Sequence, residues 1–308
     1  MSGGSRRLAE IRAQFKPADV EEPIDYWFHR PLAGALVNVL IPLPITPTQV
    51  TLLSGVIGAL SGYAMAQFTP EEPFWALVGA ALLLFSVVLD CADGQLARAR
   101  NEASVVGRAI DGMVDVVAPL SMFLGMAHVL HDQMGFTWLW IHLVGWPTGL
   151  CLFWHVNQYD HAKNLFLHHS KPPVKNLGDA AFLDMEEMRI IREKHRDAGE
   201  RMQAFLVSAL MFYMSLQGAR SDVAPEARTW SDERRAEYRE RTLSHMRGWT
   251  WMGLGTHLFV LNLGAIGAYV DVRLILVIWA LILVPFNAVC IGLLWQRRRL
   301  HQFAPEGS

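Results

Sequence analysis

The chain is 308 residues long and strongly apolar, with 52% hydrophobic residues, 18% charged residues and a mean hydropathy of +0.21. Because soluble domains usually carry about a quarter charged residues, this composition excludes an ordinary soluble protein. A net charge of −2 lacks the basic excess expected of a nucleic-acid-binding protein. The cysteines, Cys91, Cys151 and Cys290, have no paired spacing, so neither a disulfide framework nor a zinc knuckle is expected.

The N-terminal sequence up to Pro23 has no continuous apolar core, so we expect no cleaved secretory signal. Between Ser5 and Lys16, apolar residues recur near helical spacing among basic ones, which is typical of a helix lying on a membrane surface. A loosely ordered basic tail is the alternative. The apolar stretch from Pro31 to Leu43 is too short to span a membrane and ends in a proline-rich sequence, so a second interfacial helix is predicted there.

Six later stretches are apolar and long enough to be membrane spans. They are Thr46 to Phe68, Phe74 to Asp90, Ile110 to Leu130, Thr137 to Val156, Trp249 to Tyr269 and Val272 to Trp295. If all six cross, 26 of the 27 Lys and Arg residues fall on one side and only Arg273 on the other. Since cytoplasmic loops retain positive charge, we expect both termini in the cytoplasm of a cell with the protein in its inner membrane. Five crossings would scatter these charges over both faces.

The segment from Asn157 to Gly248 is predicted to be a cytoplasmic insertion. It holds 15 basic and 14 acidic residues, and Asp184 to Arg196 is expected to be helical. Ala204 to Leu216 is shorter than the roughly 20 residues of a crossing helix, so we expect it to be buried or interfacial. A crossing there would put the following basic residues outside. The predicted organisation is an N-terminal region (1–45), spans one to four (46–156), the insertion (157–248), spans five and six (249–295) and a tail (296–308).

Four acidic residues lie at the inner end of the second span and the start of the third. Asp90 and Asp93 are three residues apart and Asp111 and Asp115 four apart, so each pair shares a helix face if its helix continues. The short connection makes the two helices antiparallel neighbours, and the acids can converge at the cytoplasmic membrane boundary. Four such carboxylates need cations to stay ionised together. Oxygen ligands favour two divalent ions, Mg²⁺ or Mn²⁺, over zinc.

Small residues and an arginine accompany these acids. Gly94, Ala97 and Gly107 allow a bulky group to approach the backbone. Arg98, one turn after Gly94, presents a planar fork of donors suited to phosphate oxygens. Metals, arginine and a floor of small residues together indicate a diphosphate substrate whose P–O bond is broken.

These eight positions form the pattern D-x2-D-G-x2-A-R-x8-G-x3-D-x3-D. The chain therefore resembles the CDP-alcohol phosphotransferase family of integral membrane enzymes, as do the sequence ITPTQVT (Ile45 to Thr51) and the six-span count. The resemblance implies an all-α membrane enzyme that transfers a substituted phosphoryl group from a CDP-linked donor to an alcohol, releasing CMP. It implies that the four aspartates bind two divalent metals and that Asp115 is the general base. Gly94, Ala97 and Gly107 would frame the cytidine nucleotide, Arg98 would hold phosphate, and the enzyme would be a homodimer.

Several alternatives remain at this stage. The donor is CDP-diacylglycerol with a polar acceptor, or else a CDP-linked amino alcohol with a diacylglycerol acceptor. A membrane prenyltransferase and an ion transporter also place acids near a membrane. In a purely structural interpretation, the acids pair with Arg98, Arg100 and Arg108.

Other polar residues carry weaker predictions. A group at the inner end of the fourth span could face the acceptor or form a solvated helix end: His155, Asn157, Gln158, Tyr159 and His161. His257 and Asn262 are expected to make interhelical hydrogen bonds. A basic set could hold a phosphorylated acceptor or form a solvated face: Lys163, Lys171, Lys175 and the arginines from Arg189 to Arg201.

Overall fold

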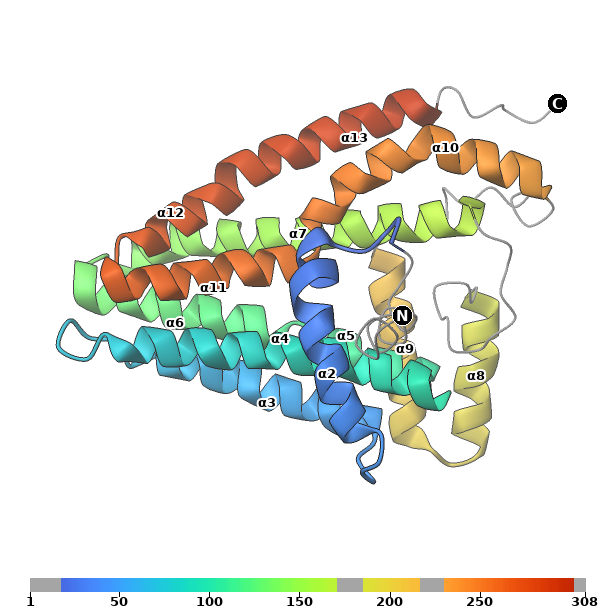
Figure 1. The fold of residues 1–308 in the computed structure, drawn as a ribbon, viewed down its shortest axis with the longest axis horizontal. Coiled ribbons are helices and arrows are strands. Elements are labelled where there is room, and N and C mark those ends of the chain that lie inside the picture. Colours follow the sequence, from blue (N-terminus) through green and yellow to red (C-terminus); the bar gives the residue numbers. More distant parts are fainter. Residues whose placement is uncertain (1–17, 171–184, 217–229, 302–308) are drawn as a thin grey trace, which may run out of the picture.

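The computed structural model describes residues 18–170, 185–216 and 230–301, which form helices and no strand. In chain order the elements are η1 (Asp25–His29), α2 (Arg30–Leu40), α3 (Pro47–Ala66), α4 (Phe74–Arg100), α5 (Val105–Val114), α6 (Val117–Met134), α7 (Trp138–Ser170), α8 (Met185–Asp197), α9 (Arg201–Leu216), α10 (Asp232–Trp249), η4 (Thr250–Met252), α11 (Leu254–Val270), α12 (Leu274–Leu281), η5 (Ile282–Phe286) and α13 (Asn287–His301). The long helices lie side by side in one bundle (Figure 1). The helix expected between Ser5 and Lys16 lies outside the described residues.

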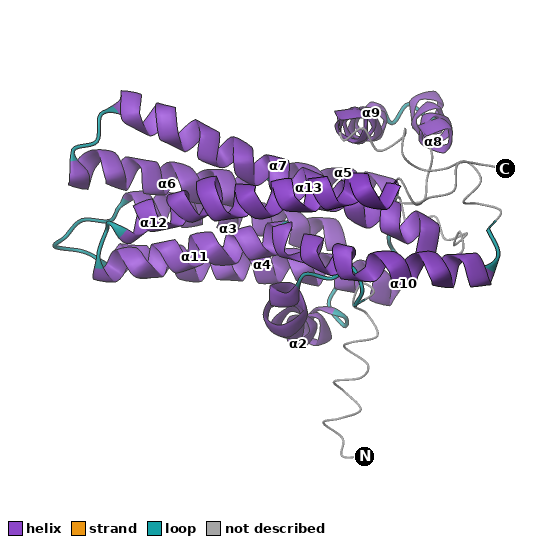
Figure 2. Ribbon diagram, turned by 90° about the horizontal axis from the view of Figure 1, so that it is seen from above, coloured by secondary structure: helices purple, strands orange, loops and turns teal. Residues whose placement is uncertain are grey.

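Five helical segments of the described chain are long and apolar enough to cross a membrane. They are Pro47–Ala66, Phe74–Arg100, Val105–Met134, Asp232–Val270 and Leu274–Arg297. The fourth expected span lies in α7, which is 33 residues long but less apolar because tryptophans and histidines interrupt it. An all-α polytopic membrane protein is therefore confirmed, while the expected count of six depends on α7, which runs along the bundle with the other long helices (Figure 2).

The first span, α3, begins at a capping box. The side chain of Thr46 accepts a hydrogen bond from the backbone N–H of Gln49, and the Gln49 side chain accepts one from the backbone N–H of Thr46. Pro47 occupies the first turn, where its missing N–H has no intrahelical partner to lose. These residues fix where α3 starts, one turn before Thr51.

Glycines on one face of α3 let α6 approach it closely. A Cβ on Gly62 would lie 2.0 Å from the carbonyl oxygen of Ser121, and a Cβ on Gly58 would lie 2.7 Å from the Cβ of Ala118. A Cβ on Gly55 would lie 2.8 Å from a methyl group of Val114. Contact at backbone distance is the way small residues hold membrane helices together. It also holds the end of α5 against α3.

The third span, expected from Ile110 to Leu130, lies within the helical segment Val105–Met134, in which two residues separate α5 from α6. The helix α5 ends at Val114 and α6 begins at Val117. Pro119 has no N–H to donate to the carbonyl of Asp115, four residues earlier, so the regular hydrogen-bond ladder is interrupted there. Asp115 lies at this junction, directly after the last residue of α5.

The N-terminal segment is tied to the bundle by buried charged side chains. Glu22 accepts hydrogen bonds from the backbone N–H (2.8 Å) and hydroxyl (3.1 Å) of Thr256, in the first turn of α11. Burial, reinforced by the nearby charge of Asp25, raises the pKa of Glu22 from its ordinary 4.5 to about 8. Arg30 pairs with Glu21 at 2.9 Å. From this anchor, α2 runs across the bundle helices, as expected of an interfacial helix (Figure 1).

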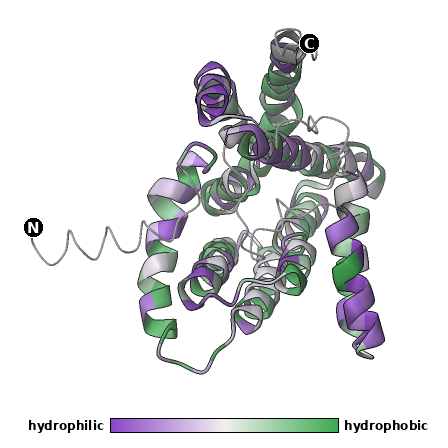
Figure 3. Ribbon diagram, turned by 90° about the vertical axis from the view of Figure 1, so that its right-hand side faces the viewer, coloured by the Kyte–Doolittle hydropathy of each residue, from purple (hydrophilic) through white to green (hydrophobic). Residues whose placement is uncertain are grey.

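The helices α8 and α9 form a hairpin at the end of the bundle opposite the α6–α7 connection. Both run across the bundle direction and lie beside it, and α2 lies on the other flank (Figures 1 and 2). Figure 3 views this end and shows the two flanking elements on opposite sides of the bundle. In contrast to the expected end of the fourth span at Val156, α7 continues to Ser170 and packs against α10. The bundle therefore extends into part of the predicted insertion.

Candidate active site

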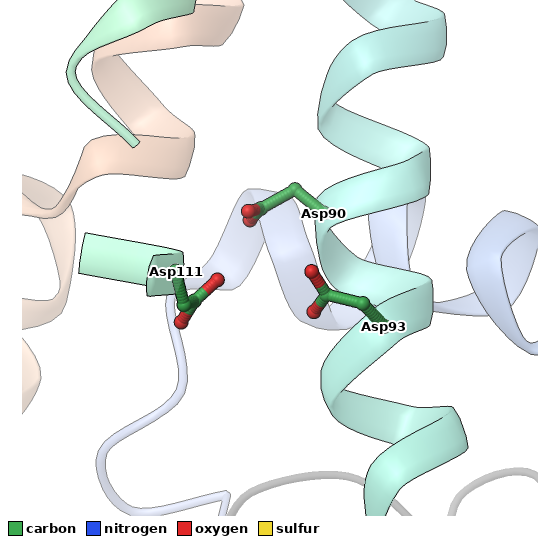
Figure 4. A group of neighbouring side chains, drawn as sticks. All are labelled: Asp90, Asp93 and Asp111. Carbon is green, nitrogen blue, oxygen red and sulfur yellow. The ribbon is translucent and has the colours of Figure 1, made fainter. Parts of the chain in front are cut away.

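Three of the four predicted metal ligands converge between α4 and α5. Asp90, Asp93 and Asp111 each offer a carboxylate oxygen, and these oxygens lie within 4.8 Å of one another. Figure 4 shows Asp90 and Asp93 on successive turns of α4, directed toward Asp111 on α5. Asp93 is buried, whereas Asp90 and Asp111 are half-buried. The group thus remains accessible at one side while being held by two helices.

A tight reversal between α4 and α5 brings these acids together. Asn101 ends α4 in the left-handed conformation, with φ of 56°, which asparagine tolerates better than most residues. The N–H of Glu102 donates to the carbonyl of Ala97 at 2.9 Å and closes the helix end. Ser104 then caps α5 by accepting the N–H of Gly107 at 3.0 Å. Only four residues therefore separate the two acid-bearing helices.

A threonine on α3 completes the surroundings of Asp93. The buried hydroxyl of Thr51 donates to Oδ2 of Asp93 and also lies 3.1 Å from the carbonyl oxygen of Pro47. This contact was not predicted from the sequence, although Thr51 is the last residue of the ITPTQVT sequence that carries part of the family resemblance. Its position one turn into α3 was the available signal. The contact orients the carboxylate of a candidate metal ligand from a third helix.

Asp115 lies next to the cluster, at the junction of α5 and α6. It lines a small cavity together with Asp90, and it interacts electrostatically with Asp90 and Asp111. Its Oδ1 is buried and has no hydrogen-bond partner among the described residues. A buried carboxylate oxygen without a partner is costly and often marks a ligand or a functional role. All four predicted acids are thus neighbours.

The residues predicted to contact the nucleotide lie on the helix ends beside the acids. Gly94 and Ala97 occupy the last two turns of α4, and Gly107 occupies the first turn of α5. A Cβ on Gly94 would lie 3.3 Å from Nη1 of Arg98, so the glycine gives the guanidinium room to fold back along α4. A Cβ on Gly107 would lie 3.0 Å from the hydroxyl oxygen of Ser104. These small residues border the acids on the side facing the α4–α5 turn.

Arg100 has a structural role that the sequence did not reveal. Its guanidinium donates to four backbone carbonyls in and after α2, at distances of 2.6 to 2.9 Å. The acceptors are Leu40, Ile41, Leu43 and Ile45. These contacts hold the α2–α3 connection against the end of α4. They also argue against the structural alternative in which Arg100 neutralises the acids.

The donor set fits a hard divalent cation. The three converging side chains supply only oxygen atoms from carboxylates, which suits Mg²⁺ or Mn²⁺ better than zinc. The unpartnered Oδ1 of Asp115 adds a further buried oxygen beside them. Held this close, the carboxylates repel one another unless positive charge lies between them.

Several other polar candidates are engaged in interhelical contacts. His257 and Asn262 make the hydrogen bonds expected of them, His257 to His155 of α7 at 3.2 Å and Asn262 to the carbonyl of Ala80 in α4 at 2.7 Å. The Tyr159 hydroxyl donates to the carbonyl of Val20 at 2.7 Å, and His161 contacts Arg297 at 2.6 Å.

Two of the remaining basic candidates pair with acids on their own helices. Lys163 pairs with Asp160, and Arg189 pairs with Glu186 at 3.1 Å. Lys171 and Lys175 lie outside the described residues. The exposed Arg189 fits the solvated-face interpretation, whereas the Lys163 side chain is only 12% exposed and lies over the ring of Tyr159.

The part of the chain that carries these acids is similar to known proteins. Residues 44–173 match the CDP-alcohol phosphatidyltransferase family, whose members are transferases of substituted phosphate groups. The "Bifunctional IPC transferase and DIPP synthase" of Rubrobacter xylanophilus is 34% identical over 88 residues, which are 29% of this chain and 19% of that protein. The chain thus spans about a fifth of the length of that relative. No solved structure matches the chain.

The matched segment runs from the start of α3 to the end of α7 and contains all four acids, both glycines and Arg98. The family uses divalent metal, in agreement with the oxygen donors that converge here. The segment 44–173 is thus similar to the CDP-alcohol phosphatidyltransferase family and contains the complete motif.

Proposed function

We propose that the chain transfers a phosphatidyl group from CDP-diacylglycerol to a polar alcohol and releases CMP, as a step of phospholipid synthesis. The acceptor is a sugar alcohol, inositol phosphate, glycerol phosphate or amino alcohol. The observation that carries this proposal is the convergence of Asp90, Asp93 and Asp111 within the segment that matches the family. Similarity to the family alone supports only the coarser statement of a phosphotransferase that uses a CDP-alcohol.

In this proposal Asp90, Asp93, Asp111 and Asp115 hold two divalent ions, Mg²⁺ or Mn²⁺. When bound, such ions neutralise the diphosphate of the donor and stabilise the charge that develops on the leaving CMP. Thr51 keeps the carboxylate of Asp93 oriented through its hydroxyl. Gly94, Ala97 and Gly107 leave space for the cytidine, and Arg98 binds a phosphate oxygen.

Asp115 is assigned as the general base. The acceptor oxygen forms a new bond to the phosphorus of the phosphatidyl group, the bond from that phosphorus to the CMP oxygen breaks, and the hydroxyl proton passes to Asp115. The buried Oδ1 of Asp115, which has no hydrogen-bond partner among the described residues, supports this role. A carboxylate is a weak base for an alcohol, so the reaction needs a loose transition state or an acidified hydroxyl.

An apolar groove beside the acids supports a lipid substrate. It is lined by α4 and α11 residues, including Leu84, Phe259 and Ile266. Two of its residues, Val87 and Leu258, also line the cavity that contains Asp90 and Asp115. A lipid chain in the groove would therefore lie next to the reacting groups. Both the CDP-diacylglycerol donor and the alternative diacylglycerol acceptor meet this requirement.

The proposal includes an orientation and an assembly. The charge distribution of the sequence supports a site facing the cytoplasm, with both termini on that side of the inner membrane. A homodimer is part of the proposal through the family resemblance alone.

The test uses purified protein in lipid nanodiscs, each CDP-linked donor in turn, a panel of acceptors, and CMP release as the readout. We expect CMP release that requires Mg²⁺ or Mn²⁺ and falls at least 100-fold in Asp111→Asn. Asp132→Asn is the matched control, since Asp132 lies on α6, at the far end from the acid cluster, and pairs with His128 on the surface. Consumption of prenyl diphosphate, or cation flux without CMP release, would replace the proposal by one of the alternative functions.

A further inference from the structure

The hairpin of α8 and α9 lies outside the family-matched residues 44–173 and contacts the helix that carries Asp111. The contact is apolar. Val105 and Ala109 on α5 are buried against Val207 and Leu210 on α9 and Met188 on α8. On α5 these two residues lie opposite Gly107 and Asp111, because positions four apart share a helix face while positions two apart do not.

The hairpin is one of two main supports of α5. With only 10 residues, α5 is too short to be stable alone, and its main packing partners are α3 on one side and α9 on the other. The inner face of α9 is therefore covered by α5 and α8. Nothing in that contact involves the opposite face of α9.

The outer face of α9 is apolar and uncovered. Met202, Phe205 and Phe212 are 67%, 61% and 65% exposed, whereas Val207 on the inner face is 0% exposed. Their spacing of three and seven residues places all three on one stripe of the helix. Two exposed phenylalanines and a methionine on one stripe of a 16-residue helix form an unusual surface for contact with water.

The position of α9 indicates what covers this stripe. The helix runs across the bundle beside it, at the end where the acids lie, as α2 does on the opposite flank (Figures 1 and 3). The helix α5, which α9 contacts, is followed in the chain by α6. On α6 the apolar residues Leu120 and Leu124 are exposed, and this surface is expected to face lipid. The stripe is thus carried by a helix that packs against α5, the helix that leads directly into this surface.

The length of α9 excludes a crossing. Sixteen residues extend about 24 Å, less than the roughly 30 Å of the hydrocarbon core. The exposed Arg201 at its start suits contact with phosphate groups of lipids. We propose that the outer stripe of α9 (Met202, Phe205 and Phe212) lies in the interfacial layer of the lipid bilayer, so that the membrane surface supports the helix that presents Asp111.

The test is independent of catalysis. A nitroxide or NBD label is placed on Phe205→Cys and, separately, on Phe212→Cys in the full chain, reconstituted in vesicles whose acyl chains carry bromine. We expect several-fold stronger NBD quenching by bromolipids at both positions than at Glu193→Cys, an exposed control position on α8. Native Cys91 and Cys290 are buried and Cys151 is half-buried, so wild-type protein carried through labelling measures the background from these cysteines.

Two outcomes would overturn the proposal. Quenching at positions 205 and 212 no greater than at 193 places the stripe in water, and short label-to-label distances by electron paramagnetic resonance without bromolipid quenching assign it to a second copy of the chain. The two positions are read separately, and Met202→Cys provides a third if one variant fails to fold. If the enzymatic proposal is wrong, the quenching result is unaffected, so the two failures are distinguishable.

Discussion

Replacing Thr51 by valine tests whether α3 helps to form the metal site. The two side chains have nearly the same shape, so the substitution removes the hydroxyl that donates to Asp93 and leaves the packing. Thr51 is 4% exposed, and water cannot easily take the place of the lost donor. A carboxylate oxygen that loses a buried hydrogen bond is less well oriented and more costly to keep ionised.

The expected effect is large. A hydrogen bond to a charged group contributes roughly 1.5 to 3 kcal/mol, and about 1.4 kcal/mol corresponds to a tenfold change. Loss of an outer partner of a metal ligand typically costs about 10- to 100-fold in affinity, in agreement with that range. In Thr51→Val we therefore expect the Mg²⁺ or Mn²⁺ concentration for half-maximal CMP release to rise about tenfold or more.

Thr148→Val is the matched control. Thr148 is also a buried threonine of a long helix, and its hydroxyl donates to the carbonyl four residues earlier, as that of Thr51 can to Pro47. It has no carboxylate partner, so its substitution should leave the metal dependence unchanged. If Thr51→Val has the metal dependence of the wild type, or if both variants shift equally, then Thr51 does not support a metal ligand and the reasoning is refuted.

Three further predictions concern stability. Gly62→Ala should destabilise the protein by about 1 to 3 kcal/mol in thermal unfolding, because the new Cβ would lie 2.0 Å from the carbonyl oxygen of Ser121. Gly149→Ala is the control, since its Cβ would have no atom within 4 Å, and equal melting temperatures of the two variants would contradict the prediction. Arg100→Lys should lower the free energy of unfolding by about 2 kcal/mol and expose the α2–α3 connection to proteolysis, since an ammonium group cannot reach four carbonyls. If a protease cleaves the variant there no faster than the wild type, the prediction is wrong. Glu22, with a folded pKa of about 8 above its ordinary 4.5, binds its proton more tightly when folded, so stability should fall as the pH rises between these values, by up to about 1.4 kcal/mol per unit. Glu22→Gln should remove that slope in unfolding measured from pH 5 to pH 8, and an unchanged slope would assign it to other groups.

The acid cluster could be predicted because it depends on local spacing. Asp90 and Asp93 share a face of α4, and the turn at Asn101 and Ser104 returns the chain within four residues. The membrane spans could likewise be predicted from the sequence, since a helix that crosses lipid requires a long run of apolar residues. These features need no knowledge of what packs against them.

The contacts between distant segments could not be predicted in the same way. Thr51 meets Asp93 across 42 positions of the sequence, and Arg100 reaches carbonyls more than 50 positions away. The helix α7 continues to Ser170, where it packs against α10. This continuation was not predicted because the sequence after Val156 is polar and the contact with α10 is distant in sequence. The junction of α5 and α6 at Asp115, by contrast, has a local signal in Pro119, which lacks the backbone N–H of a regular helix.

The position of Asp111 depends on three features that lie outside α5. The glycines of α3 let α6 pack at backbone distance, and this holds the end of α5 near α3. Pro119 removes one backbone hydrogen bond at the junction of α5 and α6, so α6 holds the end of α5 less firmly than an unbroken helix would. The contact with α9 holds the opposite side of α5. Because α5 has only 10 residues and no stability of its own, loosening any of these three supports should move Asp111 away from Asp90 and Asp93 while leaving the spans folded.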